Sequence, residues 1–466
     1  MTKQAESLSM QAMPGPRLVL INPWIYDFAA YNLWAKPLGL LYLAAILRRN
    51  GFAVDFVDCL ATRHPEISGG LNGERSKRRK FGTGKFLRTA VPKSFGLKDI
   101  PKTYSRYGIT SEEFKARLKV IERPAAVLVT SLMTYWYPGV FEAIRLAKEI
   151  FPGVPIILGG IYATLCTGHA RERSGADYIL SGPGEAQLLD LLSDITGHEP
   201  AFVSETNTLD DHPYPAFDLL GDRDYVCLLT SRGCPFRCAY CASHKLAPLF
   251  TQRAPEAVLR EIYYWYHKYH IKDFTFYDDA LLINKKSHIW PILEEVIREK
   301  LPVRFHTPNA LHIREIDDYT ARLLFQAGFK TIRFGFETAN MARHRDMDGK
   351  ICEGDLIQAI KYLRQAGFEA KEIGVYILAG LPGQEWREVA YSIDYVKAAG
   401  GMPYLAEYSP IPGSPLWPKA VETARFPIAA DPIYQNNSLF PCAGDFSWET
   451  VQRIKMQVRA ARGINC

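Results

Sequence analysis

Over the first 200 positions, short and continuous runs of apolar residues alternate with segments in which apolar residues recur at helical intervals. The runs at 17–22 and 126–132 read as buried strands, whereas 37–49 places apolar residues at helical intervals. Strands that are apolar on both faces and separated by helices are typical of a doubly wound parallel sheet. We therefore predict a Rossmann-like α/β domain over residues 1–196. Its remaining elements are expected as strands at 53–58, 155–160 and 176–180, and as helices at 139–151, from 163 and at 185–195.

One stretch of this domain departs from the alternation. Residues 60–123 are basic and rich in Gly and Pro, and within them only 111–121 has helical spacing. We interpret the stretch as an insertion whose basic run, 77–80, lies in a solvated loop. In doubly wound sheets, ligands bind beyond the carboxyl ends of the strands. The candidate binding positions are therefore the strand ends at 22–24, 130–137, 159–162 and 181–185.

A second alternation of strands and helices begins after a polar, Pro-containing linker at 197–224. Six strand–helix units are too few for a closed eight-stranded barrel. We therefore predict an open, partial (β/α)6 barrel of the TIM type over 225–409. The remaining 410–466 is expected to be a short tail, irregular until a helix near 447–462. The six barrel strands are expected near 225–231, 273–277, 303–308, 331–336, 372–379 and 402–408.

Three cysteines directly follow the first strand of the predicted barrel. Cys234, Cys238 and Cys241 lie within eight residues, so their thiols can converge on one small inorganic cluster. Iron–sulfur clusters are held by thiolates, usually four. No fourth cysteine is nearby in the sequence, which would leave one iron with an open coordination site for chemistry. A structural zinc site completed by His244 and a purely electron-transferring cluster are the alternatives.

Composition narrows the class of protein. The chain has 466 residues, 47% of them hydrophobic and 23% charged, as in globular proteins. Its longest apolar stretch, 38–47, is about half of a membrane span, and residues 1–16 lack the apolar segment of a secretory signal. We therefore expect a cytoplasmic protein without a membrane partner, whose nine cysteines are mostly reduced thiols. The net charge of +6 is modest and no nucleic-acid motif is present, so a metal-stabilised nucleic-acid-binding protein is kept only as an alternative.

The cysteine spacing, CxxxCxxC, resembles the signature of the radical S-adenosylmethionine (SAM) superfamily, and the resemblance extends over 225–410. It implies a [4Fe–4S] cluster on the three thiolates, with SAM chelated by the fourth iron and cleaved to a 5′-deoxyadenosyl radical. Tyr240 matches the aromatic position near the adenine, and Glu337 is the candidate for the ribose hydroxyls. The family's Gly-Gly-Glu segment is absent, which leaves the methionine amino group to backbone and Asp278. The SAM-binding residues that the resemblance implies are Tyr240, Asp278, Asn309, Glu337, Ala379 and Gly380.

The amino-terminal domain is similar to the cobalamin-binding domain that precedes the barrel in one large radical SAM subgroup. The similarity rests on residues 36–45, 158–164 and 182–185. It implies cobalamin as a further cofactor, with the lower face of the cobalt left to an aromatic side chain or to water, because the motif Asp-x-His-x-x-Gly is absent. The implied cobalamin-binding residues are Thr130, Ser131, Tyr135, Gly159, Gly160, Tyr162, Gly182 and Glu185.

The combined resemblance implies a cobalamin-dependent radical SAM enzyme that methylates an unactivated carbon of a small molecule. It also implies an electron donor such as flavodoxin or ferredoxin. The alternative enzyme is a cobalamin-independent radical enzyme, for rearrangement, cyclisation or other C–H functionalisation, that keeps the first domain as a scaffold. No catalytic residue is assigned. The candidates are Cys442, in a tail that can reach the active face, and Tyr277, at the end of the second barrel strand.

Overall fold

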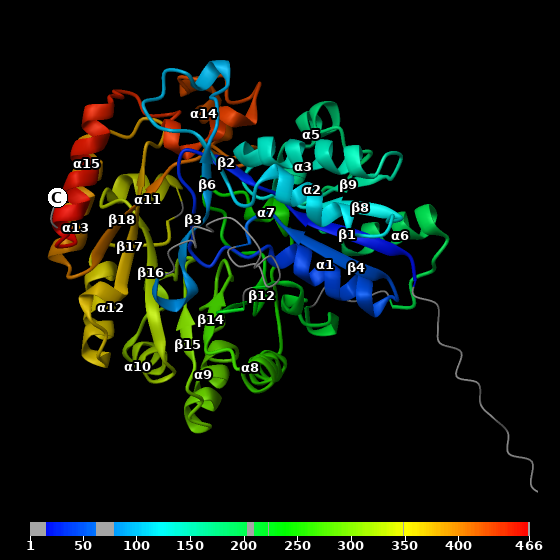
Figure 1. The fold of residues 1–466 in the computed structure, drawn as a ribbon. Helices are drawn as coiled ribbons and strands as arrows, with labels where there is room; N and C mark the ends of the chain where they lie inside the picture. Colours follow the sequence, from blue (N-terminus) through cyan, green and yellow to red (C-terminus); the bar gives the residue numbers. More distant parts are fainter. Residues whose placement is uncertain (1–14, 62–78, 203–208, 222, 348, 465–466) are drawn as a thin grey trace, which may run out of the picture.

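The computed structural model consists of two parallel sheets, each covered by helices, with the carboxyl-terminal tail over the top and the left side of the molecule as drawn in Figure 1. It describes residues 15–61, 79–202, 209–221, 223–347 and 349–464. The segment 1–14 and part of the basic run at 77–80 therefore lie outside the described residues.

The amino-terminal sheet confirms the predicted doubly wound class. Its strands are all parallel, and the chain reverses its direction of winding between β1 and β8. Alternate residues of β1 enter different cores: Leu18 and Leu20 face α1 and α6, whereas Val19 and Ile21 face α2 and α3. This two-sided burial is why the strands are apolar throughout. In spatial order they are β10 (Tyr178–Ile179), β9 (Ile156–Leu158), β8 (Ala126–Val129), β1 (Arg17–Asn22) and β4 (Ala53–Asp58).

Helices follow most of these strands, as the pattern predicts. Thr110 begins α2 by accepting a hydrogen bond from the backbone N–H of Glu113, and Gly197 ends α6 in the left-handed conformation. The helices are α1 (Leu38–Arg49), α2 (Ser111–Lys119), α3 (Tyr137–Ile150), α4 (Ile161–Leu165), α5 (Thr167–Arg173) and α6 (Glu185–Thr196).

The stretch 60–123 contains more structure than the predicted single helix. Besides α2, it contributes short strands that pair antiparallel with segments following β1. These strands are two or three residues long and partly polar, so they give no period-2 signal in the sequence. The pairs are β2 (Ile25–Asp27) and β6 (Arg88–Ala90), both with β7 (Ser105–Tyr107), and β3 (Tyr31–Asn32) with β5 (Gly84–Lys85).

The second sheet confirms the open partial barrel. Six parallel strands stand side by side in the order of the sequence. They are β11 (Val226–Leu228), β14 (Asp273–Phe276), β15 (Arg304–His306), β16 (Phe329–Glu337), β17 (Ile373–Ala379) and β18 (Met402–Glu407). The intervening helices are α8 (Pro255–Tyr269), α9 (Ile289–Arg298), α10 (Asp318–Gln326), α11 (Met341–Met347), α12 (Asp355–Ala366) and α13 (Trp386–Ala398).

Helix α1 joins the two halves because it is buried on both sides. Leu38 and Leu41 belong to the barrel core, whereas Leu40 and Leu47 belong to the core of the first sheet. The tail consists of α14 (Trp417–Thr423), an irregular segment and α15 (Trp448–Ala461), which packs on α13. In the irregular segment, the amide nitrogen of Asn436 donates to Asp27 at 2.8 Å, so the tail is bonded to the first domain.

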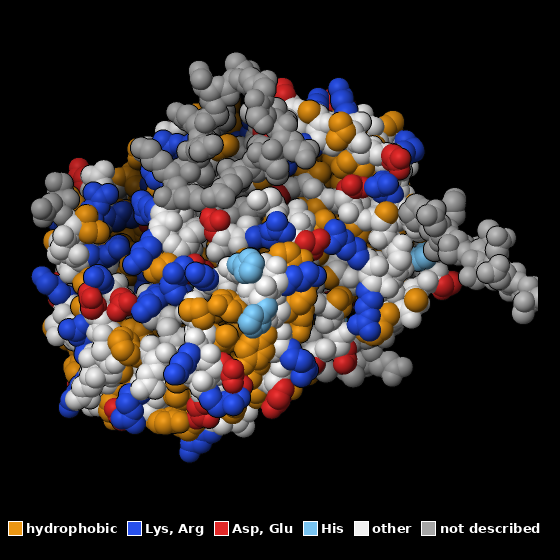
Figure 2. Space-filling view, turned by 60° about the horizontal axis from the view of Figure 1, so that its bottom comes forward, with side chains coloured by type: hydrophobic (Ala, Val, Ile, Leu, Met, Phe, Trp, Pro, Cys, Tyr) orange, Lys and Arg blue, Asp and Glu red, His pale blue; other side chains and the backbone are white. Residues whose placement is uncertain are grey.

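The surface carries charges of both signs. On the face shown in Figure 2, Lys and Arg side chains are scattered among acidic and apolar ones. Within the part of the chain that the structure describes, no helix has the length and apolarity to span a membrane.

Candidate active site

The three cysteines lie in a pocket of about 330 Å3 at the carboxyl ends of the barrel strands. We call it the cysteine pocket. Cys234, Cys238 and Cys241 form one side, in the loop after β12 (Ser231–Arg232). The rest of the lining comes from the ends of successive strands: Asp279 after β14, 308–312 after β15, Gly335 and Glu337 of β16, and Tyr376 of β17, together with Tyr240, Ser243 and Lys350.

The thiols of this pocket are partly shielded from water. Cys238 is buried and the other two are half-buried, and none forms a disulfide. Burial raises the pKa of Cys234 to about 11, so its free thiol stays protonated at neutral pH. A metal that binds these sulfurs would have to displace protons, because the thiolate is the ligand.

Glu337 faces the cysteine loop across the pocket. The hydroxyl of Tyr240 donates to Oε1 of Glu337 at 2.8 Å. The backbone of Glu337 is in the left-handed region, with φ of +62°, which is unusual for a residue other than Gly. A Cβ at Gly335 would lie 2.9 Å from this carboxylate oxygen, so a larger residue there would displace the carboxylate from its present position. The strand end is therefore shaped to bring one carboxylate beside the cysteine loop.

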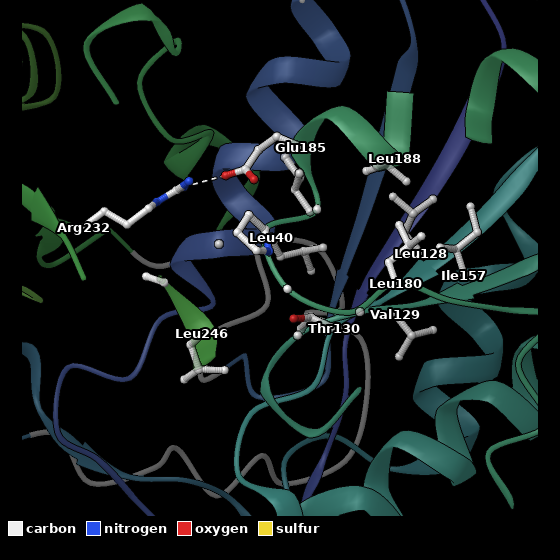
Figure 3. Close-up of a pocket in the computed structure, with 18 residues that line it drawn as sticks. Leu40, Leu128, Val129, Thr130, Ile157, Leu180, Glu185, Leu188, Arg232 and Leu246 are labelled. Atoms are coloured by element: carbon white, nitrogen blue, oxygen red, sulfur yellow. Dashed lines mark hydrogen bonds and ion pairs between the residues drawn. The ribbon is translucent and has the colours of Figure 1, made fainter. Parts of the chain in front are cut away.

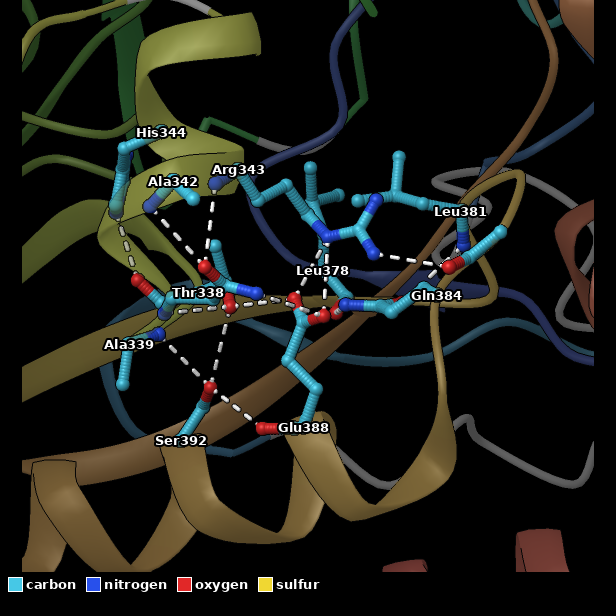
Figure 4. A network of polar contacts seen from close by, with 12 residues as sticks. Thr338, Ala339, Ala342, Arg343, His344, Leu378, Leu381, Gln384, Glu388 and Ser392 are labelled. Carbon is cyan, nitrogen blue, oxygen red and sulfur yellow. Dashed lines mark hydrogen bonds and ion pairs between the residues drawn. The ribbon is translucent and has the colours of Figure 1, made fainter.

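A polar network just behind this strand end fixes its course (Figure 4). Thr338 donates through its hydroxyl to Glu388 at 2.7 Å, and Arg343 pairs with the same carboxylate at 2.8 Å. The amide of Gln384 closes the turn after β17, accepting from the backbone N–H of Gly380 at 2.9 Å. These contacts tie the ends of β16 and β17 to α11 and α13.

A second pocket, of about 250 Å3, lies at the carboxyl ends of β8, β9 and β10 (Figure 3). We call it the apolar slot. Its floor consists of aliphatic side chains from strands β8 and β9 and from α1 and α6, and its rim is rich in glycine. The residues that line it are Gly39, Leu40, Leu43, Leu128, Val129, Thr130, Ile157, Gly159, Gly160, Leu180, Gly182, Pro183, Gly184, Glu185, Leu188, Arg232, Leu246 and Ala247.

The glycines leave real space at the rim. A Cβ built at Gly39, Gly182 or Gly184 would meet no atom within 4 Å. Gly182 also needs its conformational freedom, because its φ is +82°. The slot can therefore accept a flat, apolar group that approaches the backbone closely.

One segment of the chain, residues 232–247, lines both pockets. Arg232, two residues before the first cysteine of the motif, lines the slot and forms an ion pair of 2.5 Å with Glu185 at the start of α6 (Figure 3). Leu246 and Ala247, at the end of α7 (Ser243–Leu246), line the slot from the other side of the motif. The mouth of the barrel thus abuts the carboxyl ends of the first sheet.

Comparison with known proteins identifies both halves. The model of the radical SAM superfamily matches residues 228–396, and that of the B12-binding domain matches residues 103–192. The chain has a radical SAM domain preceded by a B12-binding domain. This is the arrangement of the radical SAM subgroup with an amino-terminal cobalamin-binding domain.

Similar proteins cover most of the radical SAM chain. An uncharacterized methyltransferase of Pyrococcus horikoshii is 27% identical, over 65% of this chain and 71% of its own. The cytidylyl-2-hydroxyethylphosphonate methyltransferase of Streptomyces wedmorensis is 22% identical, over 82% of this chain and 77% of its own. The radical SAM methyltransferase TsrM from Kitasatospora setae, solved with cobalamin and a [4Fe–4S] cluster, shares the fold. Its TM-score is 0.63 at 15% identity, over 97% of this chain and 89% of that one.

The residues of the cysteine pocket fit the cluster of a radical SAM protein. Its lining supplies three thiols in the described part of the chain and carboxylates opposite them. No three His, Cys, Asp or Glu side chains converge on a single metal ion among the described residues, and a four-iron cluster does not require it, because each thiolate binds a different iron. The structure brings Tyr240, Asn309 and Glu337 to the pocket with the cysteines.

Other residues predicted to bind SAM lie outside this lining. Asp278 is buried and accepts hydrogen bonds from the hydroxyls of Thr230 and Ser231, at 2.7 and 2.6 Å. Its carboxylate therefore fixes the segment that leads into the cysteine loop. Its neighbour Asp279 faces the pocket instead. Ala379 and Gly380 are buried too; a Cβ at Gly380 would lie 3.0 Å from the ring of Phe440.

The two catalytic candidates also lie away from the cysteine pocket. The hydroxyl of Tyr277 donates to the carbonyl of Trp34, which joins the barrel to the segment before α1. Cys442 is 1% exposed, and its thiol lies 3.6 Å from the carbonyl of Ala420 within an apolar cluster formed by the tail and the barrel. Burial raises the pKa of Cys442 to about 12, which keeps it as an unreactive thiol.

The predicted cobalamin residues divide in the same way. Thr130, Gly159, Gly160, Gly182 and Glu185 line the apolar slot. Ser131 lies behind it, where its hydroxyl donates to the carbonyl of Gly159 at 2.6 Å. Tyr135 and Tyr162 are buried within the first domain, and Tyr162 bonds to His169 at 2.7 Å, so neither ring enters the slot.

Sequence reasoning missed several lining residues. Asp279 sits next to a predicted residue, and the strand end was a sufficient signal for it. Lys350 and Tyr376 reach the cysteine pocket from outside any motif, and no local pattern marks them. Arg232 lies only two residues before the cysteine motif, yet it faces the other pocket. Only the packing of the two domains assigns it there.

Proposed function

We propose that this protein is a cobalamin-dependent radical SAM methyltransferase acting on a small molecule. One observation carries the proposal: a single segment, residues 232–247, lines both the pocket with the three thiols and the glycine-rimmed apolar slot. An enzyme that combines two cofactors on one substrate needs this proximity. The methyltransferase relatives support the outcome of the reaction.

Each pocket has residues suited to one cofactor. Cys234, Cys238 and Cys241 would hold the cluster, and the apolar slot would hold part of the cobalamin. When bound, the cluster supplies the electron that converts SAM into a hydrogen-abstracting radical, and cobalamin supplies the methyl group. The corrinoid would be held by its fit to the slot and not by a histidine bound to the cobalt.

The side chains of the cysteine pocket would orient SAM. Glu337 presents a carboxylate for the ribose hydroxyls, held by the hydroxyl of Tyr240. Asp279 takes the role first predicted for Asp278, since it faces the pocket and its carboxylate can accept a hydrogen bond from the methionine amino group. Burial and then the charge of Asp278 raise the pKa of Asp279 to about 6, so it is mostly ionised at neutral pH.

Two further assignments rest on the sequence and the chemistry. The reaction requires one electron from outside, and a flavodoxin or ferredoxin is our proposed donor. The cytoplasmic location stays a prediction.

The experiment is anaerobic reconstitution with iron and sulfide, followed by absorption spectra with and without hydroxocobalamin. We expect a brown protein that retains the corrinoid and forms 5′-deoxyadenosine. With SAM carrying a deuterated methyl group and a metabolite extract, mass spectrometry should show a deuterated methyl transferred to a small molecule. A brown protein that retains no corrinoid would favour the cobalamin-independent enzyme, and a colourless protein containing zinc would refute the radical reaction.

A further inference from the structure

The chain on either side of the cysteine motif lines the apolar slot. Arg232 precedes Cys234 by two residues, and Leu246 follows Cys241 by five. Both line the apolar slot, while the cysteines between them line the other pocket. A group that fills the slot would therefore contact both stems of the loop that holds the thiols.

These stems are tied to each other rather than free. Strand β12 pairs with β13 (Thr251–Gln252), so Arg232 lies opposite Thr251 across an antiparallel ladder. Gly233 lies between Arg232 and the first cysteine. A Cβ at this position would lie 2.5 Å from the carbonyl oxygen of Leu249, so only Gly fits there. A contact that fixes the position of Arg232 or of α7 therefore also fixes the positions of the three thiols, because only a short, closely packed segment separates them.

The first domain holds this segment at two points. The guanidinium of Arg232 and the carboxylate of Glu185 are 2.5 Å apart, with side-chain exposures of 27% and 21%. Arg232 lowers the pKa of Glu185 below its usual range although burial alone would raise it, so the pair is ionised at neutral pH. In addition, α4 packs against α7. Glu185 begins α6 directly after the glycine rim, where a bound group would contact it.

We propose that the two cofactor sites are coupled: filling the apolar slot strengthens cluster binding by the three cysteines, and the cluster strengthens binding in the slot. The coupling runs through the Arg232–Glu185 pair and α7. It deepens the proposed function, on which it rests. Both cofactors would favour the same arrangement of the loop stems, so binding of one favours binding of the other, and by thermodynamic linkage the effect must be equal in both directions.

The test is a titration of hydroxocobalamin into cluster-free and cluster-loaded protein, read by the absorption of the corrinoid. Coupling free energies between sites commonly correspond to about 5- to 150-fold changes in affinity. We expect the dissociation constant to be at least about fivefold lower with the cluster present. Reciprocally, the cluster absorbance should decay more slowly in a chelator when hydroxocobalamin is bound.

Arg232→Ala and Glu185→Gln should each bring the ratio of dissociation constants close to one. Glu149→Gln is the matched control, because it removes an exposed pair with Lys115 (2.7 Å) elsewhere on the first domain and should leave the ratio unchanged. Glu185→Gln preserves the shape of the side chain, so it tests the pair without the risk of a collapsed slot.

The possible results are distinguishable. Equal dissociation constants in the unmodified protein, with the corrinoid still bound, would overturn the coupling and leave the proposed function standing. A ratio that survives in both variants would overturn the route through Arg232 and Glu185. A protein that binds no corrinoid with or without the cluster would overturn both proposals.

Discussion

The cysteine pocket and the apolar slot both lie at the carboxyl ends of parallel strands, yet different parts of the chain supply their binding surfaces. In the cysteine pocket, polar and reactive side chains form the binding surface: three thiols from one loop, carboxylates from the ends of two strands, and a lysine from the segment between α11 and α12. In the slot, the surface is aliphatic floor and bare glycine backbone, with one ion pair at its edge. One pocket is thus defined by chemistry and the other by shape.

This difference explains what each type of substitution should do. A pocket that works through side-chain chemistry fails when an atom that binds or reacts is removed. A pocket that works through shape fails when an atom is added to empty space. Substitutions can therefore be chosen that impair one pocket and leave the other intact.

Replacing Cys234, Cys238 and Cys241 together by Ala should abolish the cluster. Without thiolates, no iron is held, so we expect no brown absorbance and 5′-deoxyadenosine at the background level. Iron content and the amount of 5′-deoxyadenosine are the measurements. Cys352→Ala, at an exposed position, is the matched control and should behave like the unmodified protein. Activity that survives the triple replacement would refute the ligand assignment.

Adding a side chain at the glycine rim should close the slot while the cysteine pocket continues to work. Gly39 lies in α1, where Leu is favoured over Gly by about 1 kcal/mol, so Gly39→Leu should not harm the fold. Overpacking costs about 1–3 kcal/mol, which predicts roughly thirtyfold weaker hydroxocobalamin binding. The dissociation constant of hydroxocobalamin, measured by the absorption of the corrinoid, checks this prediction.

The control for this variant is Gly168→Leu. Gly168 is also a helical glycine with nothing near its Cβ, but it lies in α5 outside the slot. It should bind the corrinoid normally, and both variants should form the cluster. If Gly39→Leu retained normal affinity, the slot would not be where the corrinoid is held.

Glu337→Gln tests whether charge, rather than shape, is what the cysteine pocket offers to SAM. The amide keeps the size of the side chain and a hydrogen bond from Tyr240, but it loses the negative charge. Hydrogen bonds to charged groups contribute about 1.5–3 kcal/mol, so we expect SAM to bind roughly tenfold more weakly to the cluster-loaded protein. Equilibrium dialysis with labelled SAM is suitable. Glu294→Gln, at an exposed position on α9, should have no effect.

The contrast between a pocket defined by side-chain chemistry and one defined by shape also explains how much could be predicted from the sequence. Both sheets and most helices are predictable because the strands are continuously apolar and the helices follow the 3.6-residue period. The cysteine pocket was largely predictable too, since its ligands lie in one contiguous motif at a strand end. Glycines of the slot such as Gly159 and Gly182 could be found as strand ends, but Gly39 and Leu246 could not. They reach the slot only because α1 is buried between the domains and α7 faces the first sheet.

The predicted residues that lie outside the two pockets have one reason in common. Tyr277, Asp278 and Asp279 follow β14 directly, yet only Asp279 lines the pocket, and a sequence does not show which way each side chain points once the strand has ended. Tyr135 and Tyr162 were expected at the cobalamin from the resemblance, yet they lie in a short 3-10 helix and in α4, and both rings are buried in the core. Side-chain direction at a strand end is a tertiary property.

Cys442→Ala is expected to have the smallest effect, and it tests whether the reactive chemistry is confined to the cysteine pocket. The thiol is buried among apolar residues of the tail and the barrel and makes one long contact with the carbonyl of Ala420, so Ala loses little more than a sulfur atom's packing. We expect 5′-deoxyadenosine formation and product yield within about threefold of the unmodified protein, a difference under about 0.7 kcal/mol. A loss of product with unchanged 5′-deoxyadenosine would show that this thiol reaches the substrate after SAM is cleaved. The tail would then have to open during turnover, and the reactive side chains would no longer be those of the cysteine pocket alone.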